Sequence, residues 1–118
     1  MKPIVIFNDK FLDSVSWFMR VGGIALFPFI ILREKRKKDK FLYVLINHET
    51  IHFKQALELL VIPFYLLYLL SWAYNLFKYK FDTNKAYRNI PFEKEAYANE
   101  LDRNYIDNRK LYSWVKYI

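Results

Sequence analysis

Both histidines of the chain lie in one segment, His48-Glu49-Thr50-Ile51-His52. On an α-helix, residues four positions apart project from the same face, so the two imidazoles can bind one metal ion from consecutive turns. Glu49 lies at the flank of that face, where it can reach a metal-bound water without binding the metal. The segment therefore predicts a helix, and the rest of the fold must bring a further ligand to its histidine-bearing face. The alternative is an ordinary helix whose histidines hydrogen-bond to neighbouring residues or to water.

The composition predicts a single folded domain over residues 1–118 with an aromatic core. Hydrophobic residues make up 54% of the chain and aromatic residues 20%, and only two residues are glycine. This composition is far from that of disordered proteins, and the length suits one core. The chain has no cysteine, which excludes disulfides and thiolate ligands, so any metal must be held by nitrogen and oxygen atoms.

The chain is basic, with 19 Lys and Arg against 12 Asp and Glu and a net charge of +7. Part of the excess lies in residues 33–40, which we expect to form a solvated loop; contact with anionic lipid headgroups is the second interpretation. No base-stacking motif accompanies these residues, so we expect no nucleic-acid partner. The apolar run at residues 4–7 is short and no cleavage site of small residues follows it, so it does not predict a secretory signal. We therefore expect a cytoplasmic protein, with membrane association left open.

Short apolar segments precede the histidine segment. Residues 4–7 predict a strand that ends in a turn or helix cap, and residues 10–20 predict a helix. Residues 24–32 follow the Gly22-Gly23 break and predict a strand, and Pro28 within them indicates an edge position. Such an edge offers free backbone groups to which an extended peptide can pair. We therefore predict an α+β fold, predominantly α, with a short edge strand or hairpin before the histidine helix and two or more further helices after it.

The spacing of apolar residues becomes helical from Phe41 onward. One stripe of this helix contains Phe41, Leu45, His48, His52, Gln55 and Leu59. Pro63 should kink or end the helix, and a second apolar stretch continues to Phe77. Residues 78–89 predict a polar loop with a turn at Asp82-Thr83-Asn84. Pro91 fits the first turn of a final helix, with Asn89 near its cap, that runs through Glu100 and on toward Tyr117.

The two histidines need one further ligand, because a catalytic zinc site normally has three protein ligands and one open position for water. No histidine remains, so a carboxylate must supply it. Helical spacing places Glu93 in the apolar arc of the final helix with Glu100 close to it, and Glu95 on the face expected to be solvated. We assign the third ligand to Glu93 and keep Glu95 in reserve; an acid favoured by the helix dipole is the alternative for Glu93. Glu100 as a fourth ligand would instead indicate a structural zinc site.

Other polar residues near the candidate ligands have weaker assignments. Gln55 lies on the histidine stripe and can orient a histidine ring, although an ordinary surface amide is an equal alternative. Four residues close in sequence to Glu93 are candidate donors to a developing oxyanion, and packing is the favoured interpretation for each: Tyr87, Arg88, Tyr97 and Tyr105.

The motif HETIH, followed by a helix that contains PFEKEA, resembles the gluzincins, zinc metallopeptidases with an HExxH helix and a glutamate ligand on a later helix, and especially their minimal single-domain forms. The segments FPFIILRE, HETIHFKQ and YRNIPFEKEAYANE also resemble a small, largely uncharacterised bacterial family of zincin-like proteins. The resemblance covers roughly residues 24–105. It implies a compact zincin-like domain in which His48, His52 and Glu93 bind Zn²⁺ and Glu49 is the general base. Tyr97 departs from the pattern, because many gluzincins have an acid or amide at that position.

The resemblance implies zinc-dependent hydrolysis of a peptide or protein substrate. The alternative is a catalytically silent zinc-binding or membrane-associated interaction module with the same fold. A third hypothesis is a small membrane-anchoring protein in which the motif is accidental and binds no metal.

Residues 59–77 contain no charged residue, and Ser71 and Asn75 are their only clearly polar side chains. The stretch is long enough to span a bilayer, but a core element of a soluble domain is the favoured interpretation, and a span and a peripheral membrane contact are the alternatives. In either membrane case, residues 33–40 and 59–80 are the segments expected to meet the lipid.

Overall fold

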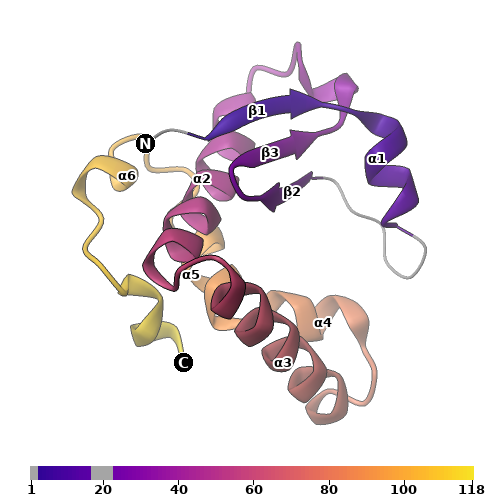
Figure 1. Cartoon of the computed structure of the whole chain (residues 1–118), viewed down its shortest axis with the longest axis vertical. Coiled ribbons are helices and arrows are strands. Elements are labelled where there is room, and N and C mark those ends of the chain that lie inside the picture. The colour runs from indigo at the N-terminus through magenta and orange to yellow at the C-terminus, as the bar shows by residue number, and fades with distance from the viewer. Residues whose placement is uncertain (1–2, 17–22) are drawn as a thin grey trace.

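The computed structural model describes residues 3–16 and 23–118 (Figure 1). The strands are β1 (Ile4–Phe7), β2 (Gly23–Leu26) and β3 (Phe29–Leu32). The helices are α1 (Asp9–Ser14), α2 (Leu42–Glu58), α3 (Ile62–Lys78), α4 (Thr83–Arg88), α5 (Pro91–Asn99) and α6 (Tyr105–Asn108), with short 3-10 helices η1 (Glu34–Arg36) and η2 (Ser113–Tyr117). The fold is α+β and predominantly helical, which confirms the predicted class.

The strands form one sheet in the order β1-β3-β2, with β1 parallel and β2 antiparallel to β3. The central strand β3 buries Ile30, Ile31 and Leu32. The predicted single strand over residues 24–32 is wrong in this detail, because Phe27 and Pro28 form the turn of a hairpin between β2 and β3. A proline at this turn lies outside the paired strands, so its missing N–H removes no ladder hydrogen bond. The expected hairpin before the histidine helix is present, and β2 is its edge strand.

The segment after β1 is shorter than predicted. Asn8 caps α1, since its side chain accepts a hydrogen bond from the Phe11 N–H at 3.0 Å. This confirms the predicted cap. The helix then ends at Ser14 rather than at residue 20, and residues 17–20 of the predicted helix lie outside the described ranges.

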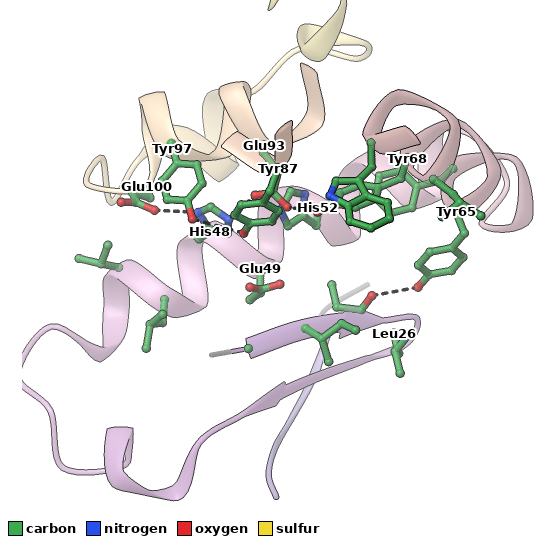
Figure 2. A pocket seen from close by; sticks show the side chains of 18 of the residues that line it. Leu26, His48, Glu49, His52, Tyr65, Tyr68, Tyr87, Glu93, Tyr97 and Glu100 are labelled. Carbon is green, nitrogen blue, oxygen red and sulfur yellow. Dashed lines mark hydrogen bonds and ion pairs between the residues drawn. The ribbon is translucent and has the colours of Figure 1, made fainter. Parts of the chain in front are cut away.

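Helix α2 contacts the sheet through β2 and β3, and it also contacts α3 and α5. It therefore buries more than one stripe. Phe53 stacks on Phe27 of the hairpin, with 5.1 Å between ring centroids, whereas His48 and His52 lie toward α5 (Figure 2). Phe41 departs from the predicted stripe, because it occupies the N-cap position of α2 and is exposed.

Two consecutive residues with positive φ set the path of α3. After α2, Leu60 and Val61 have φ values of 59° and 69°, and the Val61 N–H bonds to the Ala56 carbonyl at 2.7 Å. This is the hydrogen-bond pattern that ends a helix and reverses its direction. Pro63 then lies in the first turn of α3, where its missing N–H removes no helical hydrogen bond. The prediction that the first helix ends near Pro63 is confirmed.

The break bends α2 against α3 by 115°. Among the described residues, no single helix has the length and apolar character needed to cross a membrane, although α2 and α3 satisfy that test together as a bent pair.

The region after α3 holds more helix than predicted, and the last helix is shorter than predicted. Asp82, Thr83 and Asn84 begin helix α4 instead of forming only a turn, because the Asp82 side chain caps it by accepting from the Lys85 N–H at 3.1 Å. The prediction of a loop over residues 78–89 is therefore wrong for Thr83–Arg88, which are helical. Helix α5 starts at Pro91 as predicted but ends at Asn99, and the chain then turns into α6 and η2.

Candidate metal centre

The predicted ligands come together in the structure. His48 Nε2 lies 2.9 Å and His52 Nε2 lies 3.0 Å from the same oxygen, Glu93 Oε1. One nitrogen of each imidazole and one carboxylate oxygen all lie within 4.8 Å of one another, and all three residues are buried. Figure 2 shows the two imidazoles of α2 turned toward Glu93 of α5. This group can hold a metal ion.

Glu100 holds the Nδ1 side of the His48 ring. His48 Nδ1 lies 2.7 Å from Glu100 Oε2, and His48 Nε2 lies 2.9 Å from Glu93 Oε1. Both carboxylates accept from the ring, and a metal ion bound between the candidate ligands would take the place of the proton on Nε2. Glu100 thus contacts the far side of a ligand ring and does not itself join the cluster of converging atoms, so it is not placed as a fourth ligand.

Gln55 fixes the tautomer of His52. The Gln55 Nε2 group donates to the Phe92 carbonyl and to Glu95 Oε1, both at 3.0 Å. Because both partners accept, the amide oxygen of Gln55 must face the other way, where it lies 2.8 Å from His52 Nδ1. His52 therefore carries its proton on Nδ1 and leaves Nε2 free. The structure gives Gln55 the ring-orienting contact expected of it, and Gln55 is fully buried.

The Nε2 atoms of His48 and His52 and one oxygen of Glu93 therefore converge on one buried point. Within residues 3–16 and 23–118, His52 Nε2 is buried without a hydrogen-bond partner, because its approach to Glu93 lacks the geometry of a hydrogen bond. Buried lone pairs that face a carboxylate repel one another unless a cation or proton lies between them. Nitrogen and oxygen ligands of this kind suit zinc and related divalent ions. The site thus fits a metal by its own chemistry.

The pKa values show the same electrostatics. Burial disfavours the charged form of His48, but the hydrogen bonds that its ring donates to Glu100 and Glu93 outweigh burial and raise the pKa of His48 to about 10. Burial likewise opposes protonation of His52, while the Glu93 carboxylate raises its pKa. Burial alone would raise the pKa of Glu93, yet the two imidazoles hold it well below its ordinary range. The pocket therefore favours a positive charge between these groups.

Tyr68 of α3 completes the surroundings of Glu93. Its hydroxyl donates to Glu93 Oε2 at 2.5 Å, so one carboxylate oxygen faces the histidines and the other is held by Tyr68. Sequence reasoning missed this residue, because it lies in the uncharged stretch at residues 59–77. A tyrosine on the face of α3 opposite its leucines was the available signal.

Glu95 is not on a solvated face, and that prediction is wrong. It is fully buried. Arg109 binds it through Nε to Oε2 at 2.6 Å and through a second guanidinium nitrogen to Oε1 at 3.0 Å, and the Tyr105 hydroxyl donates to Oε2 at 2.7 Å. Because residues 105–109 fold back over this side of α5, both Glu95 oxygens are engaged away from the metal cluster. Glu95 supports Gln55 instead.

The candidate oxyanion donors have different surroundings. The Tyr97 ring packs edge-on against the His48 ring, with 4.5 Å between centroids, and its hydroxyl donates to the Tyr87 hydroxyl at 3.3 Å. The Arg88 guanidinium stacks over the Tyr97 ring at 4.2 Å. The Tyr105 hydroxyl donates to Glu95 instead. Tyr87 and Tyr97 line the cavity described next, so they are the members of this set that a bound molecule can reach.

A cavity of about 640 Å³ adjoins the ligands, lined by residues of β2, α2, α3, α4 and α5. Glu49 is part of its wall and projects from α2 toward β2 (Figure 2). Burial raises the pKa of Glu49, opposed by the nearby His52 and His48. A β-carbon on Gly23 would lie 2.8 Å from the Leu32 side chain, so glycine at the start of β2 permits the close approach of that side chain, whereas the 3.5 Å separation from Glu49 Oε1 is an ordinary contact.

Comparisons with protein-family models, with curated proteins and with solved structures find no match to this chain.

Proposed function

We propose that the chain is a zinc-dependent hydrolase of peptide bonds, with His48, His52 and Glu93 as the metal ligands and Glu49 as the general base. One observation carries the proposal. Two histidine Nε2 atoms and a carboxylate converge beside a cavity, and separate partners, Glu100 and Gln55, hold the far side of each ring. Zinc held there would lower the pKa of a bound water and polarise the substrate carbonyl.

In this proposal, Glu49 performs the proton transfers. It accepts a proton from the attacking water and donates it to the amine of the leaving peptide. Its place in the cavity wall, on the next residue after His48, supports this role. The gluzincin resemblance of the HETIH and PFEKEA segments points to the same assignment.

Edge strand β2 is the surface to which an extended peptide would pair. Its residues Gly23 to Leu26 line the cavity. Tyr65 already occupies part of that edge, because its hydroxyl donates to the Ala25 carbonyl at 3.0 Å and accepts from the Phe27 N–H at 2.8 Å. A peptide that pairs along the whole of β2 must displace Tyr65.

The Tyr65 contact favours one alternative, a zinc-binding module without hydrolytic activity. Such a module would keep the ligands and their partners but leave the edge of β2 closed by Tyr65. The two functions share the same metal site and differ in whether a substrate reaches Glu49.

Two substitutions separate these functions. Purified protein is assayed for bound zinc by elemental analysis and for cleavage of a quenched-fluorescent peptide library. We expect near-stoichiometric zinc and cleavage by the wild type, zinc without cleavage in Glu49→Gln, and loss of both in His48→Ala. Glu34→Gln is the matched control, because Glu34 is exposed and lies outside the cavity wall. Zinc without cleavage in the wild type would establish the silent module, and absence of zinc would refute both functions.

A further inference from the structure

Helix α3 presents an apolar face to the outside of the molecule, which we name the outer face of α3. Its members are each more than half exposed: Ile62, Leu66, Leu69, Leu70, Tyr74 and Phe77. At about 100° per residue they lie within an arc of about 140°. No charged residue interrupts this face, and Lys78 is the only charged residue of the helix. Isolated exposed leucines are ordinary, whereas a continuous face of this size indicates an interaction surface.

The opposite face of α3 is already used by the domain. Phe64 and Asn75 are buried there, and Tyr68 bonds to Glu93. The outer face is therefore not a displaced part of the core. Turning it inward would expose these residues and remove Tyr68 from the metal ligand.

The charge around this face indicates what covers it. Residues 59–81 contain no Asp or Glu, and exposed Lys78 and Lys80 follow the last apolar turn. Lys85 of α4 joins them, since its ammonium and that of Lys78 both lie over the Tyr79 ring, at 4.9 and 5.4 Å. A second copy of the chain would bring another charge of +7 toward these cations. An anionic surface is instead attracted to them.

Aromatic side chains gather at the same end. Tyr74 and Phe77 belong to the outer face, and the ring of exposed Phe81 contacts that of Phe77 at 5.3 Å. Leucines, aromatic rings and lysines are the residue types typical of a helix that lies along the boundary between lipid chains and headgroups. The leucines face the lipid chains, and the aromatic rings and lysines lie at the level of the headgroups.

We propose that the outer face of α3 binds the surface of an anionic lipid bilayer, with the helix lying along the interface. The proposal does not depend on hydrolysis, because it uses residues outside the metal centre. It does, however, predict where the cavity lies relative to the membrane. Tyr65, Tyr68, Leu69 and Trp72 of α3 line the cavity, so a bilayer on the outer face would place the metal centre close to the membrane surface.

Vesicle flotation tests the proposal, because bound protein rises with the vesicles while aggregates sink. The full chain is mixed with vesicles of phosphatidylcholine alone or with phosphatidylglycerol added. We expect flotation of the wild type with the anionic vesicles, and a loss of partitioning of about a hundredfold in Leu66→Glu/Leu70→Glu. In Lys78→Gln/Lys80→Gln, partitioning onto anionic vesicles should fall about fivefold for each lysine replaced, and partitioning onto neutral vesicles should not change.

The matched control is Leu101→Glu/Leu111→Glu, which places the same charges on exposed leucines outside α3 and should float like the wild type. Circular dichroism shows that each variant is folded, and Leu66→Gln/Leu70→Gln replaces the glutamate variant if that one is not. Wild-type protein that does not float would overturn the proposal, as would equal flotation of the α3 variant and its control. A lipid-free dimer in sedimentation analysis that Leu66→Glu/Leu70→Glu dissociates would assign the face to a second copy and overturn it too.

Discussion

Replacing Gln55 with methionine isolates the contact that orients His52. The amide is fully buried and makes three contacts, to His52 Nδ1 at 2.8 Å and to Phe92 and Glu95 at 3.0 Å. Methionine has nearly the same length and volume but offers neither a strong acceptor nor a donor. In Gln55→Met the His52 ring keeps its packing and loses the partner that holds the proton on Nδ1.

The substitution should change two quantities, the metal affinity and the stability of the metal-free protein. Loss of a partner that orients a ligand weakens metal binding about 10- to 100-fold, or about 1.4 to 2.8 kcal/mol. Independently, the Phe92 carbonyl and Glu95 Oε1 lose a buried donor, so the free energy of unfolding of the metal-free protein should fall by about 1 to 3 kcal/mol. The first quantity depends on the metal site, and the second does not.

Asn75→Leu supplies the control for the stability term. Asn75 is a buried amide of α3 whose side chain donates to the Ala86 carbonyl at 3.0 Å, a partner outside the three candidate ligands. Urea unfolding of metal-free protein should show a loss in both variants, whereas a chelator-competition titration should show weakened zinc binding in Gln55→Met alone. Wild-type zinc affinity in Gln55→Met, at a stability as low as that of Asn75→Leu, would refute the assignment of Gln55.

Three further predictions concern the partners of Glu93 and Glu95. Tyr68→Phe removes the hydroxyl donor to Glu93 Oε2 and should weaken zinc binding about tenfold in the same titration; unchanged affinity would contradict the contact's role. Arg109→Met leaves buried Glu95 without its cation and should lower the free energy of unfolding by about 3 to 5 kcal/mol in urea, and a loss below about 1 kcal/mol would contradict this. Burial raises the pKa of Glu95, but hydrogen bonds from Arg109 and Gln55 outweigh burial and hold that pKa below its ordinary value of 4.5. Ionised Glu95 therefore stabilises the fold above about pH 4.5, and this stabilisation is lost as the pH falls below that value. The difference in the free energy of unfolding between wild type and Arg109→Met should therefore shrink at low pH. A difference that stays constant down to acid unfolding would contradict this prediction.

The parts of this molecule that follow from the sequence are those set by local spacing. The interval of four between His48 and His52 predicts a helix with both rings on one face, and the structure has both. Pro91 and the apolar residues after it place Glu93 on the inward face of α5, where it meets the histidines. These features depend on helical periodicity within a few turns, and periodicity is visible in one sequence.

The remaining features depend on contacts between distant segments. Glu95 looks solvated on its own helix because the groups that bury it, Arg109 and Tyr105, come from a later segment that folds back. Tyr68 lies within an apolar stretch, and its partner Glu93 is 25 residues away. No local pattern encodes these pairings, although each one affects how a candidate ligand is held.

The segment that begins at Asp82 shows a different limit of prediction from sequence. Asp-Thr-Asn is equally typical of a turn and of a helix start, and the helix that follows is only six residues long. The structure has the helix start, with Asp82 as its cap and Ala86 buried.

A crystal structure of the zinc-loaded protein, with anomalous data collected at the zinc absorption edge, would show whether His48, His52 and Glu93 bind one zinc ion. We expect one anomalous peak in contact with His48 Nε2, His52 Nε2 and a Glu93 oxygen, with a water in the fourth position facing the cavity and Glu49. A peak elsewhere in the molecule, no peak in a fully loaded sample, or Glu100 bound to the ion in place of water would contradict this expectation.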